Sequence, residues 1–129
     1  MTSKEIIKHL NKIVAVVIRR KMDVNGVNFF TNAKDPLQVA LHNYSSERET
    51  NIHKNNVRKP VIVTEFHKFL FMTDGMATVC LMSSNLETYR KIRLSTGDGI
   101  IIMNTFHKVV FTKRSNAIEI KQGPYAPDT

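Results

Sequence analysis

Residues 97–110 read Gly97-Asp98-Gly99-Ile100-Ile101-Ile102-Met103-Asn104-Thr105-Phe106-His107-Lys108-Val109-Val110. This pattern predicts a glycine-marked turn, an apolar strand, a tight turn that delivers one histidine, and a second strand. A small β-barrel uses this order to place a side chain inside its mouth. A further strand and a tail follow, in Ile118-Glu119-Ile120-Lys121-Gln122-Gly123-Pro124-Tyr125. The last third of the chain therefore predicts β-structure and makes His107 a candidate pocket residue.

The β pattern extends back to residue 25. After the turn dipeptide Asn25-Gly26, β-branched and aromatic residues dominate the sequence. We expect strands at residues 27–30, 38–44, 61–64, 66–72, 77–82, 89–94, 99–103, 108–112 and 117–121. Many short strands with turn-like separators are typical of an all-β sandwich or barrel. Residues 25–129 are therefore expected to form a single β-domain.

Residues 1–24 carry a different pattern. Thr2-Ser3-Lys4-Glu5 has the spacing of a helix capping box. Apolar residues then recur at helical spacing, at Ile6, Ile7, Leu10, Ile13, Val14 and Val17. These features predict an amphipathic N-terminal helix over residues 3–20. Its stripe lacks the aromatic anchors of membrane-surface helices, so we expect it to cover a sheet or a second copy of the chain.

Composition limits the class of protein. The chain has 129 residues, and 42% of them are hydrophobic, which suffices for the core of one domain. The apolar run Ile13 to Ile18 is far shorter than the ~20 residues of a membrane span. The single Cys80 cannot form an internal disulfide, and the sequence starts without a secretory leader pattern. We therefore expect a soluble, cytoplasmic protein.

The net charge of +8 suggests nucleic acid as a first partner. The basic residues, however, are spread from Lys4 to Lys121 along the sequence. The densest cluster, Arg19-Arg20-Lys21, has no interleaved aromatic residue on which a base could stack. We therefore rank nucleic acid below a pocket that uses part of this charge to hold a phosphorylated or carboxylated small molecule.

Motifs across residues 28–128 resemble the cupins, and among them the WbuC-type proteins of bacterial O-antigen and capsule gene clusters. Residues 97–107 resemble the second cupin motif, and residues 119–127 are similar to the family's closing segment. The earlier matches are Asn28-Phe29, Asp35-Pro36 with Gln38 and Leu41, and Ile52-His53-Lys54-Asn55. The resemblance implies an all-β fold: a cupin-type jelly-roll (double-stranded β-helix) barrel at residues 25–129, preceded by an N-terminal α-helix at residues 1–24.

The resemblance also implies a set of pocket residues. In metal-binding cupins, an H-x-H pair, a glutamate on the next strand and a later histidine hold a divalent metal inside the barrel. Here His53 and His107 match the first and the last histidine. Asn55 stands in place of the second histidine, and Lys68, which has no lone pair for a metal, in place of the glutamate. His53 and His107 are the candidate catalytic residues, because imidazole suits proton transfer near neutral pH.

Two arrangements of the pocket are open. If a bulge or a shifted register turns Glu65 and His67 inward, a nitrogen-rich site forms. Its ligands would be His53, His67 and His107, and its cofactor a divalent transition metal such as Zn, Ni or Fe. If Lys68 points inward instead, it makes a cationic pocket for phosphate or carboxylate. The candidate ligand-binding residues are Asn55, Lys68, Glu65 and Tyr125.

The family implies a protein of bacterial surface-polysaccharide biosynthesis that binds an anionic sugar or sugar nucleotide and isomerises or epimerises it. The alternative is a metal-free binding or regulatory cupin without catalysis, which the replaced ligands at Asn55 and Lys68 favour. The sequence contains no nucleophile elbow, Walker loop or dinucleotide fingerprint that would indicate another enzyme class. Whether the protein is an enzyme is left open, and a homodimer is expected.

Overall fold

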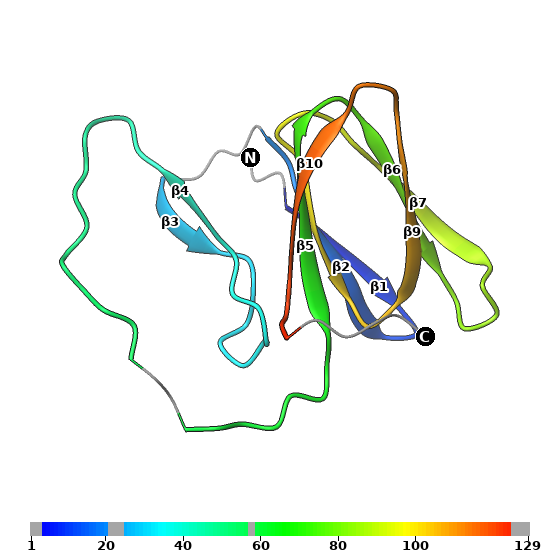
Figure 1. The fold of residues 1–129 in the computed structure, drawn as a ribbon, viewed down its shortest axis with the longest axis horizontal. Helices are drawn as coiled ribbons and strands as arrows, with labels where there is room; N and C mark the ends of the chain where they lie inside the picture. Colours follow the sequence, from blue (N-terminus) through cyan, green and yellow to red (C-terminus); the bar gives the residue numbers. More distant parts are fainter. Residues whose placement is uncertain (1–3, 21–24, 57–58, 125–129) are drawn as a thin grey trace.

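The chain folds into three layers of antiparallel strands (Figure 1). The computed structural model describes residues 4–20, 25–56 and 59–124. The central sheet has the strand order β1-β2-β8-β5-β10, a second sheet has the order β7-β6-β9, and β3 pairs with β4 in a separate arm. The strands are β1 (Lys4–His9), β2 (Lys12–Ile18), β3 (Gly26–Phe29), β4 (Ala40–Asn43), β5 (His67–Asp74), β6 (Ala77–Met82), β7 (Thr88–Leu94), β8 (Gly99–Met103), β9 (Phe106–Phe111) and β10 (Asn116–Lys121). The expected all-β class is confirmed.

The N-terminal helix expected over residues 3–20 is wrong, because this segment forms the antiparallel hairpin β1–β2. Leu10 and Asn11 make its turn, with φ angles of 52° and 63°, as a type I′ hairpin turn requires. The buried run in β2 is rich in β-branched residues, which favour a strand covered on both faces. Thr2 and Ser3 of the expected capping box lie outside the described residues.

The double substitution Leu10→Asn with Asn11→Gly should have opposite effects on stability in a hairpin and in a helix. A non-glycine residue in the left-handed region costs about 1–2 kcal/mol, and the Leu10 side chain is 83% exposed, so its removal loses little packing. We expect the free energy of unfolding to rise by about 1 kcal/mol, because Asn-Gly suits a type I′ turn. In a helix the same change would lower it by a similar amount.

Urea denaturation followed by circular dichroism measures the sign of this change. The matched control is Leu10→Ala with Asn11→Ala, which would stabilise a helix and should destabilise the hairpin turn. The hairpin would be contradicted if the double alanine variant were more stable than the wild type and the Asn-Gly variant less stable.

Two hydrophobic cores cover the two faces of the central sheet. The main core fills the space between the central sheet and β7-β6-β9, and we call the faces that meet there the inner faces. The second core lies on the outer face of the central sheet, where Phe30, Val39 and Leu41 of the arm cover β2, β5 and β8. Burial on both faces explains why Ile100, Ile101 and Ile102 are all buried although they are consecutive.

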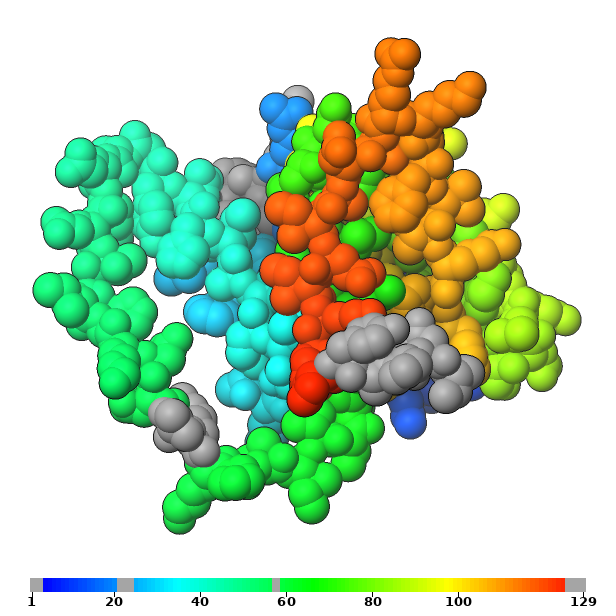
Figure 2. All heavy atoms as spheres, in the orientation of Figure 1, coloured from blue at the N-terminus to red at the C-terminus, as the bar shows by residue number. Residues whose placement is uncertain are grey.

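The arm and β5 are joined by a long segment whose described residues, 44–56 and 59–66, form no helix or strand. The strand expected at residues 61–64 is not formed, and Val61 and Ile62 are exposed. Figure 2 shows that part of the segment stands away from the rest of the molecule. The other expected strands are present, with ends that differ by up to two residues. No helix in the described ranges could cross a membrane.

Candidate functional site

A hollow of about 510 Å³ lies on the outer face of the central sheet, against the segment that follows β3. Part of its wall is apolar, with Ile6, Val16, Phe30 and Met103. Its polar lining consists of Lys4, Lys12, Asn32, Asp35, Glu65, His67 and Asn104. An apolar wall with several convergent polar groups is the usual composition of a small-molecule site.

His67 is the most deeply buried polar side chain of this hollow. It is the first residue of β5 and pairs with Met103 of β8, so it lies on the outer face. Its backbone N–H donates to Oε1 of Gln122. The preceding Phe66 N–H donates to Oδ1 of Asn104 at 3.0 Å. These contacts fix the start of β5 and therefore the position of the imidazole.

The His67 imidazole is 2% exposed, yet neither ring nitrogen forms a hydrogen bond with a described residue. Nε2 lies 3.3 Å from Oε2 of Glu65, which is an ion-pair distance without the alignment of a hydrogen bond. A buried polar group without a hydrogen-bond partner costs about 1–3 kcal/mol. This imidazole is therefore the group of the hollow that gains most from a hydrogen bond to a ligand.

The charges around His67 have both signs. Lys4 lies with Nζ 5.9 Å from the centre of the Phe30 ring, and Lys12 lines the same hollow. Oδ2 of Asp35 accepts a hydrogen bond from the Asn32 N–H at 2.9 Å, so this carboxylate also holds the turn after β3. Ammonium groups bind phosphate or carboxylate, whereas carboxylate and amide oxygens accept hydrogen bonds from hydroxyls. The lining thus suits a small polyhydroxyl molecule with an anionic group.

Lys68 and His107 lie on the inner faces, at one end of the sandwich. Lys68 pairs with Ile102, and His107 pairs with Leu81; both partners belong to the main core. Since only residues 104 and 105 separate β8 from β9, the start of β9 lies at the same end as the start of β5. Lys68 Nζ is 3.2 Å from Oε1 of Glu119. His107 Nδ1 is 2.9 Å from the carbonyl oxygen of Thr105 and therefore donates to it.

The other predicted site residues lie elsewhere. His53 and Asn55 are exposed in the irregular segment before β5, and His53 Nδ1 is 2.8 Å from the carbonyl oxygen of Asn51. Glu65 lines the hollow beside His67. Tyr125 lies outside the described residues. The structure therefore brings Glu65 and His67 together, and places Lys68 and His107 at a second location.

The structure does not assemble the expected metal ligands His53, His67 and His107. The register between β5 and β8 is regular, without the bulge that would turn His67 inward. His67 and His107 consequently lie on opposite faces of the central sheet, and His53 is in the exposed segment. No three His, Cys, Asp or Glu residues in the described part of the chain are grouped as metal ligands. The described residues therefore do not form a site that fits a resident metal.

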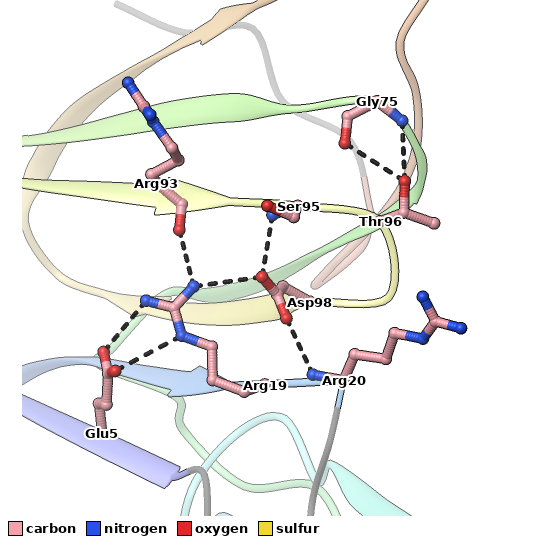
Figure 3. A network of polar contacts seen from close by, with 8 residues as sticks. All are labelled: Glu5, Arg19, Arg20, Gly75, Arg93, Ser95, Thr96 and Asp98. Carbon is pink, nitrogen blue, oxygen red and sulfur yellow. Dashed lines mark hydrogen bonds and ion pairs between the residues drawn. The ribbon is translucent and has the colours of Figure 1, made fainter.

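Asp98 has a structural role that the sequence pattern did not reveal (Figure 3). Its buried carboxylate accepts hydrogen bonds from the backbone N–H groups of Arg20 and Ser95, at 2.8 and 2.9 Å. It also accepts one from Nη1 of Arg19 at 3.2 Å, and the same nitrogen donates to the carbonyl of Arg93 at 2.7 Å. We call this network the Asp98 clasp. It ties the end of β2 to the turn before β8 and to β7.

Sequence reasoning missed the contribution of Lys4, Lys12 and Asn104 to the hollow. The two lysines belong to the segment that was expected to form a helix, whereas in the hairpin β1–β2 they line the hollow. Asn104 has a φ of 43°, a conformation that asparagine tolerates better than most residues. An asparagine directly after an apolar strand is therefore a usable signal for the turn, though not for the hollow.

No protein-family model, curated protein or solved structure matches the chain. The fold is all-β and contains a hollow with a partly polar lining, and the function has to be inferred from the chain's own residues.

Proposed function

We propose that the protein is a cupin-type jelly-roll protein of bacterial surface-polysaccharide biosynthesis that binds an anionic sugar or sugar nucleotide in the hollow beside His67. The observation that carries the binding proposal is the buried His67 imidazole, which has no hydrogen-bond partner among the described residues and lines a space of about 510 Å³. This volume lies within the ~300–1,000 Å³ of small-molecule sites. The polysaccharide pathway is proposed from the family resemblance.

The pairing of β5 to β10 supports the jelly-roll assignment. In the central sheet β5 lies between β8 and β10, and in the second sheet β6 lies between β7 and β9. The chain therefore crosses between the two sheets after β5, β7, β8 and β9. Such crossing between two facing antiparallel sheets is typical of the double-sheet jelly roll.

The lining suggests how a sugar ligand would be held. Lys12, at the same end of the central sheet as His67, would bind its phosphate or carboxylate, and Phe30 offers an apolar surface to a sugar ring. Glu65 and the His67 imidazole would bind hydroxyl groups. Charge-assisted hydrogen bonds are stronger than neutral ones, so we expect the anionic group to contribute most to the affinity.

The alternative, binding without catalysis, is favoured by one observation. The two histidines expected to transfer protons, His53 and His107, do not meet: one is in the exposed segment and the other is on an inner face. Neither lines the hollow. A bound sugar that is recovered unchanged would support the binding-only form, and its conversion to an isomer would support the enzyme.

The substitution His67→Leu separates binding from stability. We expect the affinity for an anionic sugar to fall by at least about tenfold, because the ligand loses a buried hydrogen bond. We also expect the free energy of unfolding to stay equal or to rise by about 1 kcal/mol, since an unsatisfied buried polar group is removed. Calorimetric titration with sugar phosphates, hexuronic acids and nucleoside-diphosphate sugars measures the first effect, and urea denaturation the second.

Two controls accompany this experiment. His53→Leu changes an exposed histidine in the same way and should alter neither quantity. Lys12→Gln should weaken the binding of a sugar phosphate but not that of the corresponding neutral sugar. The proposed function would be contradicted if none of these compounds bound, or if His67→Leu bound them as tightly as the wild type.

A further inference from the structure

The second sheet has an outer face that points away from the main core. Its inner positions, such as Val79, Ile92 and Leu94, belong to that core, so the alternate positions on the three strands face outward. The register places Lys91, Cys80 and Lys108 side by side in one row, and Arg93, Thr78 and Val110 in the next. A third row consists of Thr88, Met82 and Phe106. We call these nine residues the basic face.

The positive charges of the basic face are not neutralised. Lys91, Arg93 and Lys108 are exposed, and none of them forms an ion pair with a described residue. The face itself contains neither Asp nor Glu. Only the backbone carbonyl of Arg93 takes part in the Asp98 clasp, and its guanidinium extends away from that network (Figure 3).

Some basic side chains of the sandwich are paired with carboxylates. Arg19 contacts Asp98 and Glu5, and Lys68 contacts Glu119. The three cations of the basic face instead share one surface without a counter-charge, in a protein whose net charge is +8. Lys91 and Arg93 are two residues apart on β7, and Lys108 lies across β6 from them, so these like charges on one face repel each other. A bound polyanion would relieve this repulsion and release its own counterions.

An exposed aromatic ring accompanies these cations. Phe106 is 57% exposed and lies on the same face as Lys108, two residues further along β9. The linear sequence shows no such combination, because Lys91 and Arg93 reach this face from β7, across β6. Cations that contact phosphates, together with an aromatic ring on which a base stacks, are the features of single-strand binding surfaces.

We propose that the basic face binds single-stranded nucleic acid, with the phosphates on Lys91, Arg93 and Lys108 and one base stacked on Phe106. A duplex keeps its bases stacked on one another and offers little to Phe106, and a polyanion without bases would use the cations alone. This surface is on the opposite side of the main core from the hollow at His67, so it is a second site independent of the sugar-binding proposal.

Fluorescence anisotropy with a labelled oligodeoxythymidine tests the role of the charges. We expect the logarithm of the binding constant to fall with the logarithm of salt concentration with a slope of about −2, the value for about three phosphate contacts on a single strand. The triple variant Lys91→Glu, Arg93→Glu, Lys108→Glu should weaken binding by at least about tenfold at 50 mM salt. The matched control is Lys34→Glu, Lys54→Glu, Lys59→Glu, which changes the net charge equally at exposed positions and should lower the affinity by less than about threefold.

Phe106→Ala tests the base contact. It should weaken oligonucleotide binding by at least about fivefold, because one stacked base is lost, and leave the binding of inorganic polyphosphate unchanged. Equal losses in the two triple variants would overturn the proposal, since net charge alone would then explain binding. Absence of oligonucleotide binding at 50 mM salt would also overturn it. So would a result in which polyphosphate or a duplex binds as tightly as the oligonucleotide and Phe106→Ala does not weaken oligonucleotide binding.

Discussion

Replacing Ile100 by alanine is expected to lower the free energy of unfolding by about 4 kcal/mol. Ile100 is fully buried on the inner face of β8, where it pairs with Val17 of β2 and with Leu70 of β5. Both of these partners belong to the main core. Because strands hold it on both sides and the second sheet covers it, the surroundings cannot collapse into the space left by the side chain. The loss should therefore lie toward the upper end of the ~2–5 kcal/mol range for such truncations.

The same chemical change at Ile118 provides the control. Ile118 is 52% exposed in β10, the edge strand of the central sheet, and Ile118→Ala should cost less than about 1 kcal/mol. Equilibrium urea denaturation with a common slope gives both values. Similar losses in the two variants would contradict the two-sheet core described for β8.

The positions of most strands could be predicted because their cues are local. Turn-forming residues, with glycine between β5 and β6 and between β7 and β8, and β-branched runs mark β5 to β10, and the boundaries were found within two residues. The N-terminal hairpin could not be predicted in this way. Its strand β2 is buried on both faces, so apolar residues do not alternate along it, and the Leu10-Asn11 turn contains no glycine. Consecutive apolar residues then match helical spacing as well as they match a strand.

The candidate site depends on contacts between distant segments. Strand alternation indicated that His67 and Lys68 lie on opposite faces of β5. Which face meets the main core is decided by pairing with β8 and by the covering sheet, and neither can be derived from residues 65–68 alone. The hollow itself requires the segment after β3 to pack on the outer face. For this reason the sequence indicated His67 and Lys68 as candidate site residues but did not indicate which other residues lie beside them.

The second large effect is expected at Asp98. Asp98→Ala removes the acceptor for two backbone N–H groups and for the Arg19 guanidinium, all of which lie at the junction of β2, β7 and β8. We expect the free energy of unfolding to fall by about 3 kcal/mol, because these donors lose their partner in a largely buried place. Asp74→Ala, at an exposed aspartate of β5, is the matched control and should change stability by less than about 0.5 kcal/mol.

A double-mutant cycle with Arg19→Met shows how much of this loss belongs to the ion pair. If the guanidinium contributes as the clasp indicates, Asp98→Ala should cost about 1–2 kcal/mol less in the Arg19→Met background than in the wild type. The remainder would belong to the N–H groups of Arg20 and Ser95, which lose the same acceptor in both backgrounds. The free energy of unfolding of Asp98→Asn should lie between those of the wild type and Asp98→Ala. An amide oxygen still accepts hydrogen bonds but lacks the charge that Arg19 contacts. Strict additivity of the two substitutions would mean that Asp98 acts on the turn alone and that Arg19 is held by Arg93 and Glu5.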